Sequence, residues 1–326
     1  MGKDLFKTEA AVELRNPNKQ ALSIWLSNPY IKAATSDNTR KAYQSDIRHF
    51  ERWGGKLPAS LENIIEYLQY YAPTLSPATL ARRLIALKHW HLYQGLTDPT
   101  QHPAIEKTMA GITRIHGKPR QKAHPLSIEE LHTLVKYLHD IGSLSSIRDN
   151  ALIQTGFFGA LRRSELVGIQ AEHLQWKTEG IDLLIPASKT DRTHQGQFSA
   201  LPYGKGLLCP VTAIKMWLEI SGVKQGPVFR EIKKGEKLMQ KALTPLSVNL
   251  ILKKHAAACG FKHLAQLSSH SMRRGLASNA SQVGVNLAAI MRQGRWKQVN
   301  TVMEYIEASE RFSDNAALKV IQTIED

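Results

Sequence analysis

The chain has 326 residues, of which 42% are apolar and 22% charged, and this length and composition suit a globular protein with two domains. No apolar run approaches the length of a membrane-spanning helix, and the N-terminus lacks the apolar core of a secretory signal, so we expect no membrane partner and a cytoplasmic protein. Cys209 and Cys259 stand alone, which argues against a disulfide framework or a zinc site and favours two buried, reduced thiols.

The strongest signal in the composition is positive charge. The chain carries 43 Lys and Arg against 28 Asp and Glu, a net charge of +15, and residues 1–124 hold 18 of the bases against 10 acids. Such an excess favours a nucleic-acid partner, because clustered Lys and Arg release the counterions condensed on a polyanion. Charge alone leaves open the alternative of a soluble basic protein that never touches DNA.

Three stretches near the N-terminus have the apolar spacing of amphipathic helices. Residues 39–50 and 61–68 each bring their apolar side chains to one face. A third helix is predicted over residues 76–95, where Ser76 can cap the N-terminus and Pro77 suits the first turn. The first domain is therefore expected to be all-helical.

A basic linker is predicted next. Residues 107–122 carry five Lys or Arg and no acid, and they include the helix breakers Gly111, Gly117 and Pro119. We therefore assign residues 1–122 to a helical DNA-binding domain that ends in this linker. Several of its basic side chains are candidate DNA contacts, although a solvated helix surface explains each of them as well. They are Arg40, Lys41, Arg82, Arg83, Lys88, Lys118, Arg120 and Lys122.

A second domain is predicted over residues 123–326. Ser127 and Glu130 have the pattern of a capping box, which opens a helix. Residues 182–186 are typical of a short strand, and residues 200–202 of its returning partner. Further helices are predicted at 211–221, 245–259, 271–283, 287–293, 298–308 and 314–324. The expected fold is mainly α: an all-helical N-terminal domain followed by an α+β domain with a small antiparallel sheet.

Two arginine motifs in the second domain suit an attack on a phosphodiester without metal. Arg162 is followed by Glu165, and Arg273 follows His270 by three residues, so that both side chains of that pair lie on one side of a helical turn. The transition state gathers charge on the nonbridging oxygens, and the guanidinium group, always charged and bidentate, is suited to hold them. Taken singly, each motif is also explained by a surface helix, with Glu165 simply pairing with Arg162.

Tyr305 offers a phenol hydroxyl as a nucleophile. Its helical spacing is equally typical of a core tyrosine. With an ordinary pKa of about 10, ionising this phenol at pH 7 costs about 4 kcal/mol. Nearby cations and a base would lower that cost.

Together, the chemical groups resemble the tyrosine recombinase, or phage integrase, family, with most similarity to Cre and Xer-type recombinases. The family's order of Arg, Lys, His-x-x-Arg, His or Trp, and Tyr is matched by Arg162, Lys189, His270, Arg273, Trp296 and Tyr305. The resemblance covers essentially the whole chain. It implies a site-specific DNA recombinase that cuts and rejoins strands through a covalent 3′-phosphotyrosyl intermediate and a Holliday junction, without metal, ATP or another cofactor.

The resemblance also implies how the phosphate is attacked. Tyr305 would attack the phosphorus, while Arg162 and Arg273 hold its nonbridging oxygens. His270 would take the tyrosine proton.

Three further roles follow from the same resemblance. Lys189 would protonate the departing 5′-oxygen, although Lys177 and Lys205 lie near the same predicted sheet. Trp296 stands where many relatives carry His, and because indole only donates a hydrogen bond, it can support the phosphate but cannot shuttle a proton. Glu165 would orient its neighbours.

An assembly on DNA is implied as well. The two domains would form a clamp around double-stranded DNA that carries inverted-repeat recombination sites, and a C-terminal helix at about 313–326 would be exchanged between protomers. A homotetramer would act on paired sites, with a dimer on each site, and accessory proteins are compatible with this scheme. The alternatives are a type IB topoisomerase or telomere resolvase, which share the chemistry, and a catalytically silent DNA-binding regulator, which would have no need of Tyr305.

Overall fold

The computed structural model describes residues 28–119, 121–186, 196–310 and 316–322. The chain divides into two compact units, Met1–Arg120 and Gln121–Asp326. Two predicted site residues, Arg120 and Lys189, lie outside the described residues. Across the described part of the chain, no helix is both long and apolar enough to cross a membrane.

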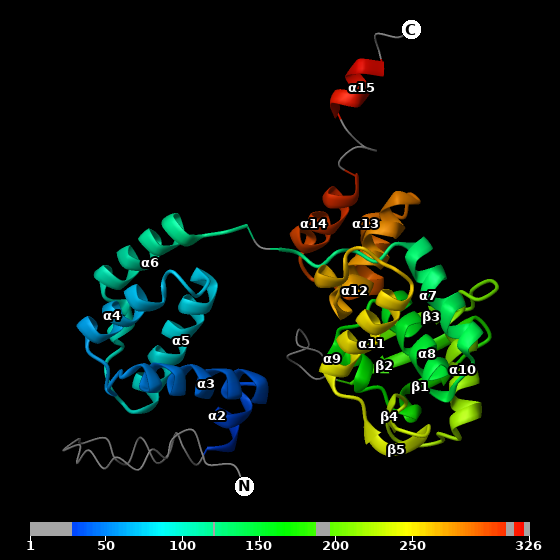
Figure 1. Cartoon of the computed structure of the whole chain (residues 1–326), viewed down its shortest axis with the longest axis horizontal. Coiled ribbons are helices and arrows are strands. Elements are labelled where there is room, and N and C mark those ends of the chain that lie inside the picture. The colour runs from blue at the N-terminus through cyan, green and yellow to red at the C-terminus, as the bar shows by residue number, and fades with distance from the viewer. Residues whose placement is uncertain (1–27, 120, 187–195, 311–315, 323–326) are drawn as a thin grey trace. The chain divides into compact units, whose positions relative to one another are not determined.

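The first unit is helical throughout its regular structure, as far as its residues are described (Figure 1). The bounds are α2 (Pro29–Ala33), α3 (Asp37–Trp53), α4 (Leu61–Tyr71), α5 (Pro77–Tyr93), a 3-10 turn (Pro99–Gln101) and α6 (Pro103–His116). Three of these helices begin at a serine: Ser36, Ser60 and Ser76 each accept a hydrogen bond, at 3.2 Å, from the backbone N–H three residues later. The three helices predicted in this domain are confirmed as α3, α4 and α5.

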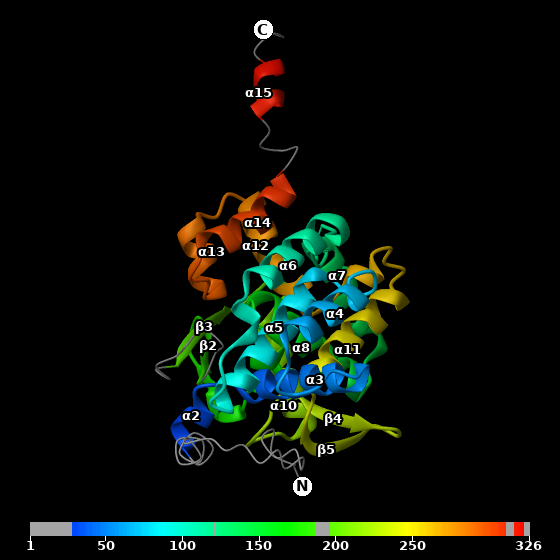
Figure 2. The ribbon, with the colours of Figure 1, turned by 90° about the vertical axis from the view of Figure 1, so that its left-hand side faces the viewer.

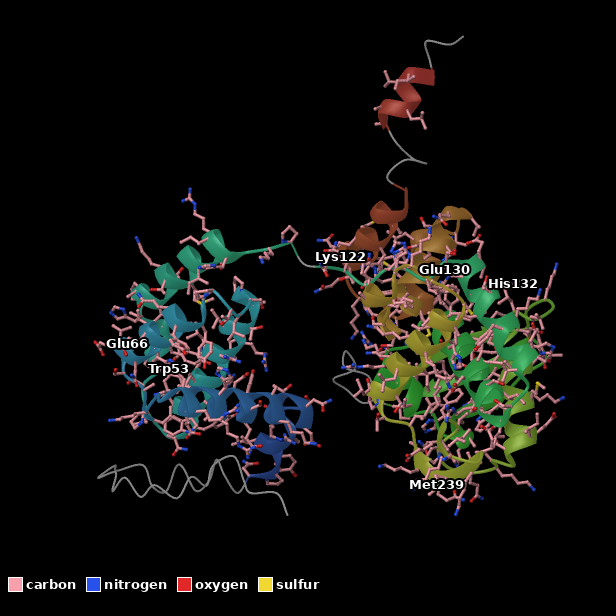
Figure 3. All side chains as sticks on the ribbon, viewed as in Figure 1. Trp53, Glu66, Lys122, Glu130, His132 and Met239 are labelled. Atoms are coloured by element: carbon pink, nitrogen blue, oxygen red, sulfur yellow. The ribbon has the colours of Figure 1, made fainter. Side chains whose placement is uncertain are left out.

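Aromatic rings form much of the core of the first unit. The ring of Tyr67 lies edge-on to the rings of Phe50 and Trp53, with centroids 5.0 and 5.3 Å away; Trp53 is labelled in Figure 3. Ile64 and Leu68, on the same helix as Tyr67, are fully covered. The apolar faces that predicted these helices therefore turn inward and pack on one another.

The irregular linker starts later than predicted. Helix α6 continues to His116, so the irregular chain begins at Gly117 rather than at about residue 107. Gly111 lies within α6 without ending it, because a glycine costs a helix only about 1 kcal/mol relative to alanine. The burial of Ile105 and Ile112 on one face of α6 outweighs that cost.

The second unit combines helices with two small antiparallel sheets, one in the order β1–β2–β3 and one of β4 with β5 (strands labelled in Figure 1). The strands are β1 (Leu174–Trp176), β2 (Gly180–Ile185), β3 (Gln197–Pro202), β4 (Arg230–Lys233) and β5 (Lys237–Ala242). The helices are α7 (Ile128–Ile141), α8 (Leu144–Phe158), α9 (Arg163–Val167), α10 (Pro210–Ser221), α11 (Pro245–Ala258), α12 (Ser269–Gln282), α13 (Leu287–Gly294), α14 (Val299–Glu310) and α15 (Ala316–Gln322). The predicted sheet is confirmed in β2 and β3, whereas β1 and the β4–β5 hairpin were not predicted.

Helices α7 and α8 show why some elements can be predicted and others cannot. The N–H of Ser127 donates to Oε2 of Glu130 at 3.0 Å, and the N–H of Glu130 donates to Oγ of Ser127 at 3.1 Å, which confirms the predicted capping box of α7. Helix α8 was not predicted. It is buried on nearly all sides, and a central helix lacks the apolar stripe that identifies a surface helix.

Helices α12, α13 and α14 lie together at one end of the second unit, as both Figure 1 and Figure 2 show. A small hydrophobic cluster fills the space between them. Its buried members are Ala160, Ala277, Ile290, Trp296, Val302, Tyr305 and Ile306. Trp296 and Tyr305, two of the predicted site residues, are therefore fixed in position by core packing.

A close approach on α12 gives a test of this packing. A Cβ atom added at Gly275 would lie 2.2 Å from the carbonyl oxygen of Leu126 and 2.9 Å from the ring of Phe157. We expect Gly275→Ala to lower the unfolding free energy of the second unit by about 2 kcal/mol, because overpacking displaces backbone. Urea unfolding of the full chain measures this. Gly111→Ala is the control, since nothing lies within 4 Å of an added Cβ there and a small gain in helix stability is expected; equal stability of Gly275→Ala and wild type would contradict the packing.

Candidate active site

The carboxylate of Glu165 joins two arginines. The backbone N–H of Arg162, immediately before α9, donates to Oε2 of Glu165 at 2.9 Å, and the Arg162 guanidinium donates to Oε1 at 2.7 Å. The guanidinium of Arg295 donates to Oε2 at 3.2 Å from the far end of α13. Burial by itself raises the pKa of Glu165, but the hydrogen bonds of Arg162 and the charge of Arg295 outweigh it and hold the pKa below its ordinary value. Glu165 is therefore an ionised anchor.

The turn that precedes Arg162 is fastened by two guanidiniums. Nη1 of Arg273 donates to the carbonyl oxygen of Ala160. Arg295 donates to the carbonyl oxygens of Gly159 at 3.1 Å and Ala160 at 3.4 Å. Ala160 itself has a positive φ of 45°, a conformation that costs free energy for any residue but glycine. The contacts from Arg273 and Arg295 hold the turn in that conformation and so fix the position of the Arg162 backbone.

Arg273 is a buried cation in a site with too little negative charge. Burial, and next the charges of Arg162 and Arg295, lower its pKa to about 9, so it remains charged at neutral pH. Its Nη2 atom is buried without a hydrogen-bond partner in the described structure. Among the residues that the structure describes, three guanidiniums thus share the one carboxylate of Glu165. An anion such as a phosphate would supply both the missing charge and the missing acceptor.

The phenol of Tyr305 meets His270 within the same chain. The Tyr305 Oη atom lies 3.0 Å from Nε2 of His270, which is exposed in the first turn of α12. The hydroxyl of Ser278 donates to the backbone carbonyl of Tyr305 at 3.1 Å and fixes α14 against α12. Such geometry allows His270 to accept the phenol proton.

Trp296 contacts both the arginine and the tyrosine. The Cζ atom of Arg273 lies 4.3 Å from the centroid of the Trp296 ring, within the range of a cation–π interaction. The ring of Tyr305 lies at 66° to the indole, with the centroids 6.1 Å apart. Arg162, Glu165, His270, Arg273, Trp296 and Tyr305 are therefore brought together at one site.

Sequence reasoning missed two arginines of this site. Arg295 is the residue that links Glu165 to the turn at Gly159 and Ala160, and Arg274 places its Cζ atom 4.9 Å from the centroid of the Tyr305 ring. Each directly follows or precedes a predicted site residue, but adjacency in sequence is no signal of contact in space. Arg295 also has a left-handed backbone, φ 55° and ψ 40°, which would have favoured glycine there.

The predicted DNA contacts of the first unit fall into two groups. Lys41 and Lys118 are exposed, Arg40 pairs with Asp37, and the half-exposed Arg82 and Lys88 pair with acids of their own unit. Arg83 differs. Its guanidinium is buried. The Nη1 atom donates to Tyr67 Oη at 2.8 Å and lies 2.9 Å from Nδ1 of His49. This placement argues against a direct DNA contact by Arg83, because its donors are used inside the domain.

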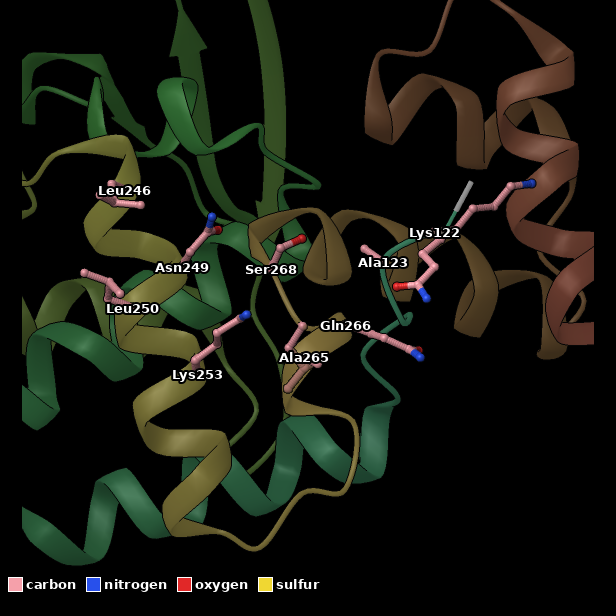
Figure 4. Close-up of a pocket in the computed structure, with 11 residues that line it drawn as sticks. Lys122, Ala123, Leu246, Asn249, Leu250, Lys253, Ala265, Gln266 and Ser268 are labelled. Atoms are coloured by element: carbon pink, nitrogen blue, oxygen red, sulfur yellow. The ribbon is translucent and has the colours of Figure 1, made fainter. Parts of the chain in front are cut away.

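A groove of about 410 Å³ opens beside the start of α12 (Figure 4). Ser268, which caps α12, lines it together with Asn249 and Lys253 of α11. Leu246 and Leu250, both 61% exposed, form its apolar side. Lys122, a DNA contact predicted in the linker of the first domain, falls in the second unit, lines the groove and pairs with Glu304 at 2.9 Å. The groove therefore offers polar donors and apolar side chains beside the N-terminus of α12.

Comparisons with known sequences cover both units. The phage integrase family pattern matches residues 125–311, and the phage integrase N-terminal SAM-like domain matches residues 25–98. An integrase/recombinase xerD homolog of Selenomonas ruminantium is 36% identical over 312 residues, which covers 93% of this chain and 90% of the relative. The recombinase cre of Escherichia phage P1 is 26% identical over 319 residues and covers 90% of each chain.

Solved structures show the same fold. XerH recombinase in a post-cleavage complex with a palindromic difH substrate has a TM-score of 0.58 at 17% identity, covering 86% of this chain and 78% of that one. A lambda integrase dimer bound to a COC′ core site has a TM-score of 0.58 at 15% identity, covering 88% and 75%.

The ionised state of Glu165 gives a testable pH dependence. Because its folded pKa lies below the ordinary value of 4.5, its contribution to stability is full above pH 4.5 and is lost as the pH falls through the folded pKa. We expect Glu165→Gln to be less stable than wild type by about 3 kcal/mol at neutral pH, with the difference shrinking in acid. Urea unfolding between neutral and acidic pH measures it.

Glu172→Gln is the matched control for this measurement. Glu172 is an exposed carboxylate whose pKa is also held low, by the N–H of Gly226, but it supports no buried arginine. We expect a much smaller loss of stability from this change. A Glu165→Gln difference that stays constant with pH would contradict the assigned role of the carboxylate.

Proposed function

Because this chain belongs to the phage integrase family and is a tyrosine-type site-specific DNA recombinase, we propose that Tyr305 is the nucleophile of its strand transfer. The observation that carries the proposal is the 3.0 Å approach of the Tyr305 hydroxyl to His270, beside the buried guanidinium of Arg273. The phenol oxygen attacks the phosphorus and forms a 3′-phosphotyrosyl bond, while the bond to the 5′-oxygen breaks. One ester replaces another, so the strand can be rejoined through a Holliday junction without ATP.

The charges of the reaction are handled by the surrounding groups. Arg162 and Arg273 hold the nonbridging oxygens, which gather charge in the transition state. His270 accepts the phenol proton as the new bond forms. Lys189 supplies a proton to the departing 5′-oxygen, and Trp296 donates a hydrogen bond to the phosphate. The uncompensated positive charge around Glu165 supports this assignment, because it is a site that an anion stabilises.

DNA contacts are proposed on both units. In the first unit, taken as residues 1–122, Arg40, Lys41, Arg82 and Lys88 would meet phosphates, and Lys118 and Arg120 would do so along the linker. Lys122, the last residue of that linker, lines the groove of Figure 4 together with Lys253 and Ser268 of the catalytic domain, which is taken as residues 123–326, and it would meet a phosphate there. Together the domains would clamp a double-stranded recombination site with inverted repeats.

We also propose assembly as a homotetramer on paired sites, with a dimer on each site. The related lambda integrase was solved as a dimer on a core site, and the XerH substrate is palindromic, which suits two protomers. The short helix α15 exposes Leu318, Val320 and Ile321, which supports its exchange onto a neighbouring protomer. Accessory proteins and association with the nucleoid are compatible with this scheme.

Covalent trapping tests the nucleophile. On a nicked duplex from which the short 5′-hydroxyl strand diffuses away, wild type is expected to accumulate a protein–DNA adduct. Tyr305→Phe should form none, because the attacking oxygen is gone. Tyr203→Phe, at a tyrosine that is 53% exposed, is the matched control and should trap as wild type does. If Tyr305→Phe forms the adduct in unchanged yield, the assignment of the nucleophile is wrong. A second assay, which measures strand exchange between two labelled duplexes, separates recombination from simple relaxation of DNA.

A substrate with a sulfur leaving group tests Lys189. Lys189→Ala is expected to slow cleavage of an ordinary duplex by about 100-fold or more, the usual contribution of a general acid. A duplex with sulfur in place of the bridging 5′-oxygen should restore the rate, because a thiolate leaves without a proton. Lys177→Ala and Lys205→Ala are the controls. If one of these two shows the loss and the rescue instead, that lysine is the general acid.

A further inference from the structure

Neighbouring arginines on α12 face different partners. Arg273 reaches the carbonyl oxygen of Ala160 and the ring of Trp296, whereas the guanidinium carbon of Arg274 lies 4.9 Å from the centroid of the Tyr305 ring. Arg274 is only 3% exposed. The mechanism proposed above uses Arg273 but gives Arg274 no role.

We propose that Arg274 is a positioning residue that favours the ionised form of the Tyr305 nucleophile. This inference rests on the proposed role of Tyr305 as the nucleophile, and it adds a cation that lies against the ring rather than against the hydroxyl. A guanidinium near an aromatic face is attracted by the negative charge of the π system. That attraction grows when the phenol loses its proton, because part of the phenolate charge spreads into the ring.

The surroundings of Arg274 leave its charge available for this purpose. Within the described residues, no carboxylate lies within ion-pairing distance of Arg274, and its buried Nε atom has no hydrogen-bond partner. The nearby carboxylate of Glu304 is paired with Lys122 at 2.9 Å. Burial lowers the pKa of Arg274, while Tyr305 and Glu304 act in the opposite sense. A buried cation that lacks a carboxylate is stabilised when negative charge develops on the ring that it contacts.

The effect would serve both halves of the reaction. At pH 7 only about one phenol in a thousand is ionised at its ordinary pKa, so favouring the phenolate speeds the attack on phosphorus. In the covalent intermediate the phenol oxygen is esterified and carries no full charge. When the strand is rejoined, the same phenolate is the leaving group. Arg274 therefore acts on the state that cleavage and rejoining share.

The pH dependence of single-turnover cleavage tests the proposal. We expect Arg274→Gln to cleave a nicked suicide duplex about tenfold more slowly than wild type at pH 7, with the gap closing as the pH rises and the phenol ionises in both proteins. DNA binding in a gel-shift assay should stay within about twofold, since the buried Arg274 makes no phosphate contact in this proposal. Lys136→Gln removes one exposed positive charge from α7 and is the control, with wild-type rates expected.

Fluorinated tyrosine at position 305 provides the second arm. The fluorine of 3-fluorotyrosine withdraws electrons from the ring and so lowers the phenol pKa without a neighbouring cation. It should therefore speed cleavage by Arg274→Gln much more than it speeds cleavage by the protein that keeps Arg274. A loss that is equal at every pH and insensitive to fluorination would mean that Arg274 only supports the fold, and it would overturn the proposal. If Arg274→Gln does not fold, Arg274→Lys decides the question: a partial loss that closes at high pH supports the proposal, and one that does not close overturns it.

These outcomes are distinct from failure of the proposed function. If the wild-type protein, which keeps Arg274, forms no adduct at Tyr305, the nucleophile assignment fails. If it forms the adduct but the variants show no change in pH dependence, only the role of Arg274 fails.

Discussion

The ionised carboxylate of Glu165 is the constraint on which the rest of the site depends. It is buried, which by itself favours the neutral acid, and it stays charged because Arg162 and Arg295 donate hydrogen bonds to it. Through Arg295 the carboxylate is tied to the turn at Gly159 and Ala160, and through Arg162 to the start of α9. One acid is thus tied to an arginine that lies 130 positions away in the chain.

The guanidiniums of Arg273 and Arg274 contact aromatic rings rather than acids. Trp296 lies against Arg273, Tyr305 lies against Arg274, and the two rings contact each other. A ring face attracts a cation without neutralising it, unlike a carboxylate. The guanidiniums are therefore held in place while their charge remains available to a phosphate. This is a physical reason for an arginine-rich site to be built with indole and phenol side chains.

Basic helix faces illustrate a limit of reading charge from sequence. On α5, Arg82 and Arg83 are neighbours of the same type, yet Arg82 is half-exposed and Arg83 is buried against His49 and Tyr67. Both lie near Asp46, whose pKa is raised because burial outweighs the two cations. The rotation of a helix by one residue, about 100°, decides which arginine faces solvent and which supports the core.

The sequence by itself determined the elements whose signal is local: the amphipathic helices α3, α4 and α5, the capping box at Ser127, and the order of site residues from Arg162 to Tyr305. These follow from side-chain periodicity and from chemistry at fixed spacing. Only the tertiary structure decided the rest. The buried helix α8 has no stripe, the β4–β5 hairpin has no strong alternation, and Arg274 and Arg295 gain their partners from residues far away in the chain. Contacts between distant segments leave no periodic pattern in the sequence, so they can be identified only in the folded chain.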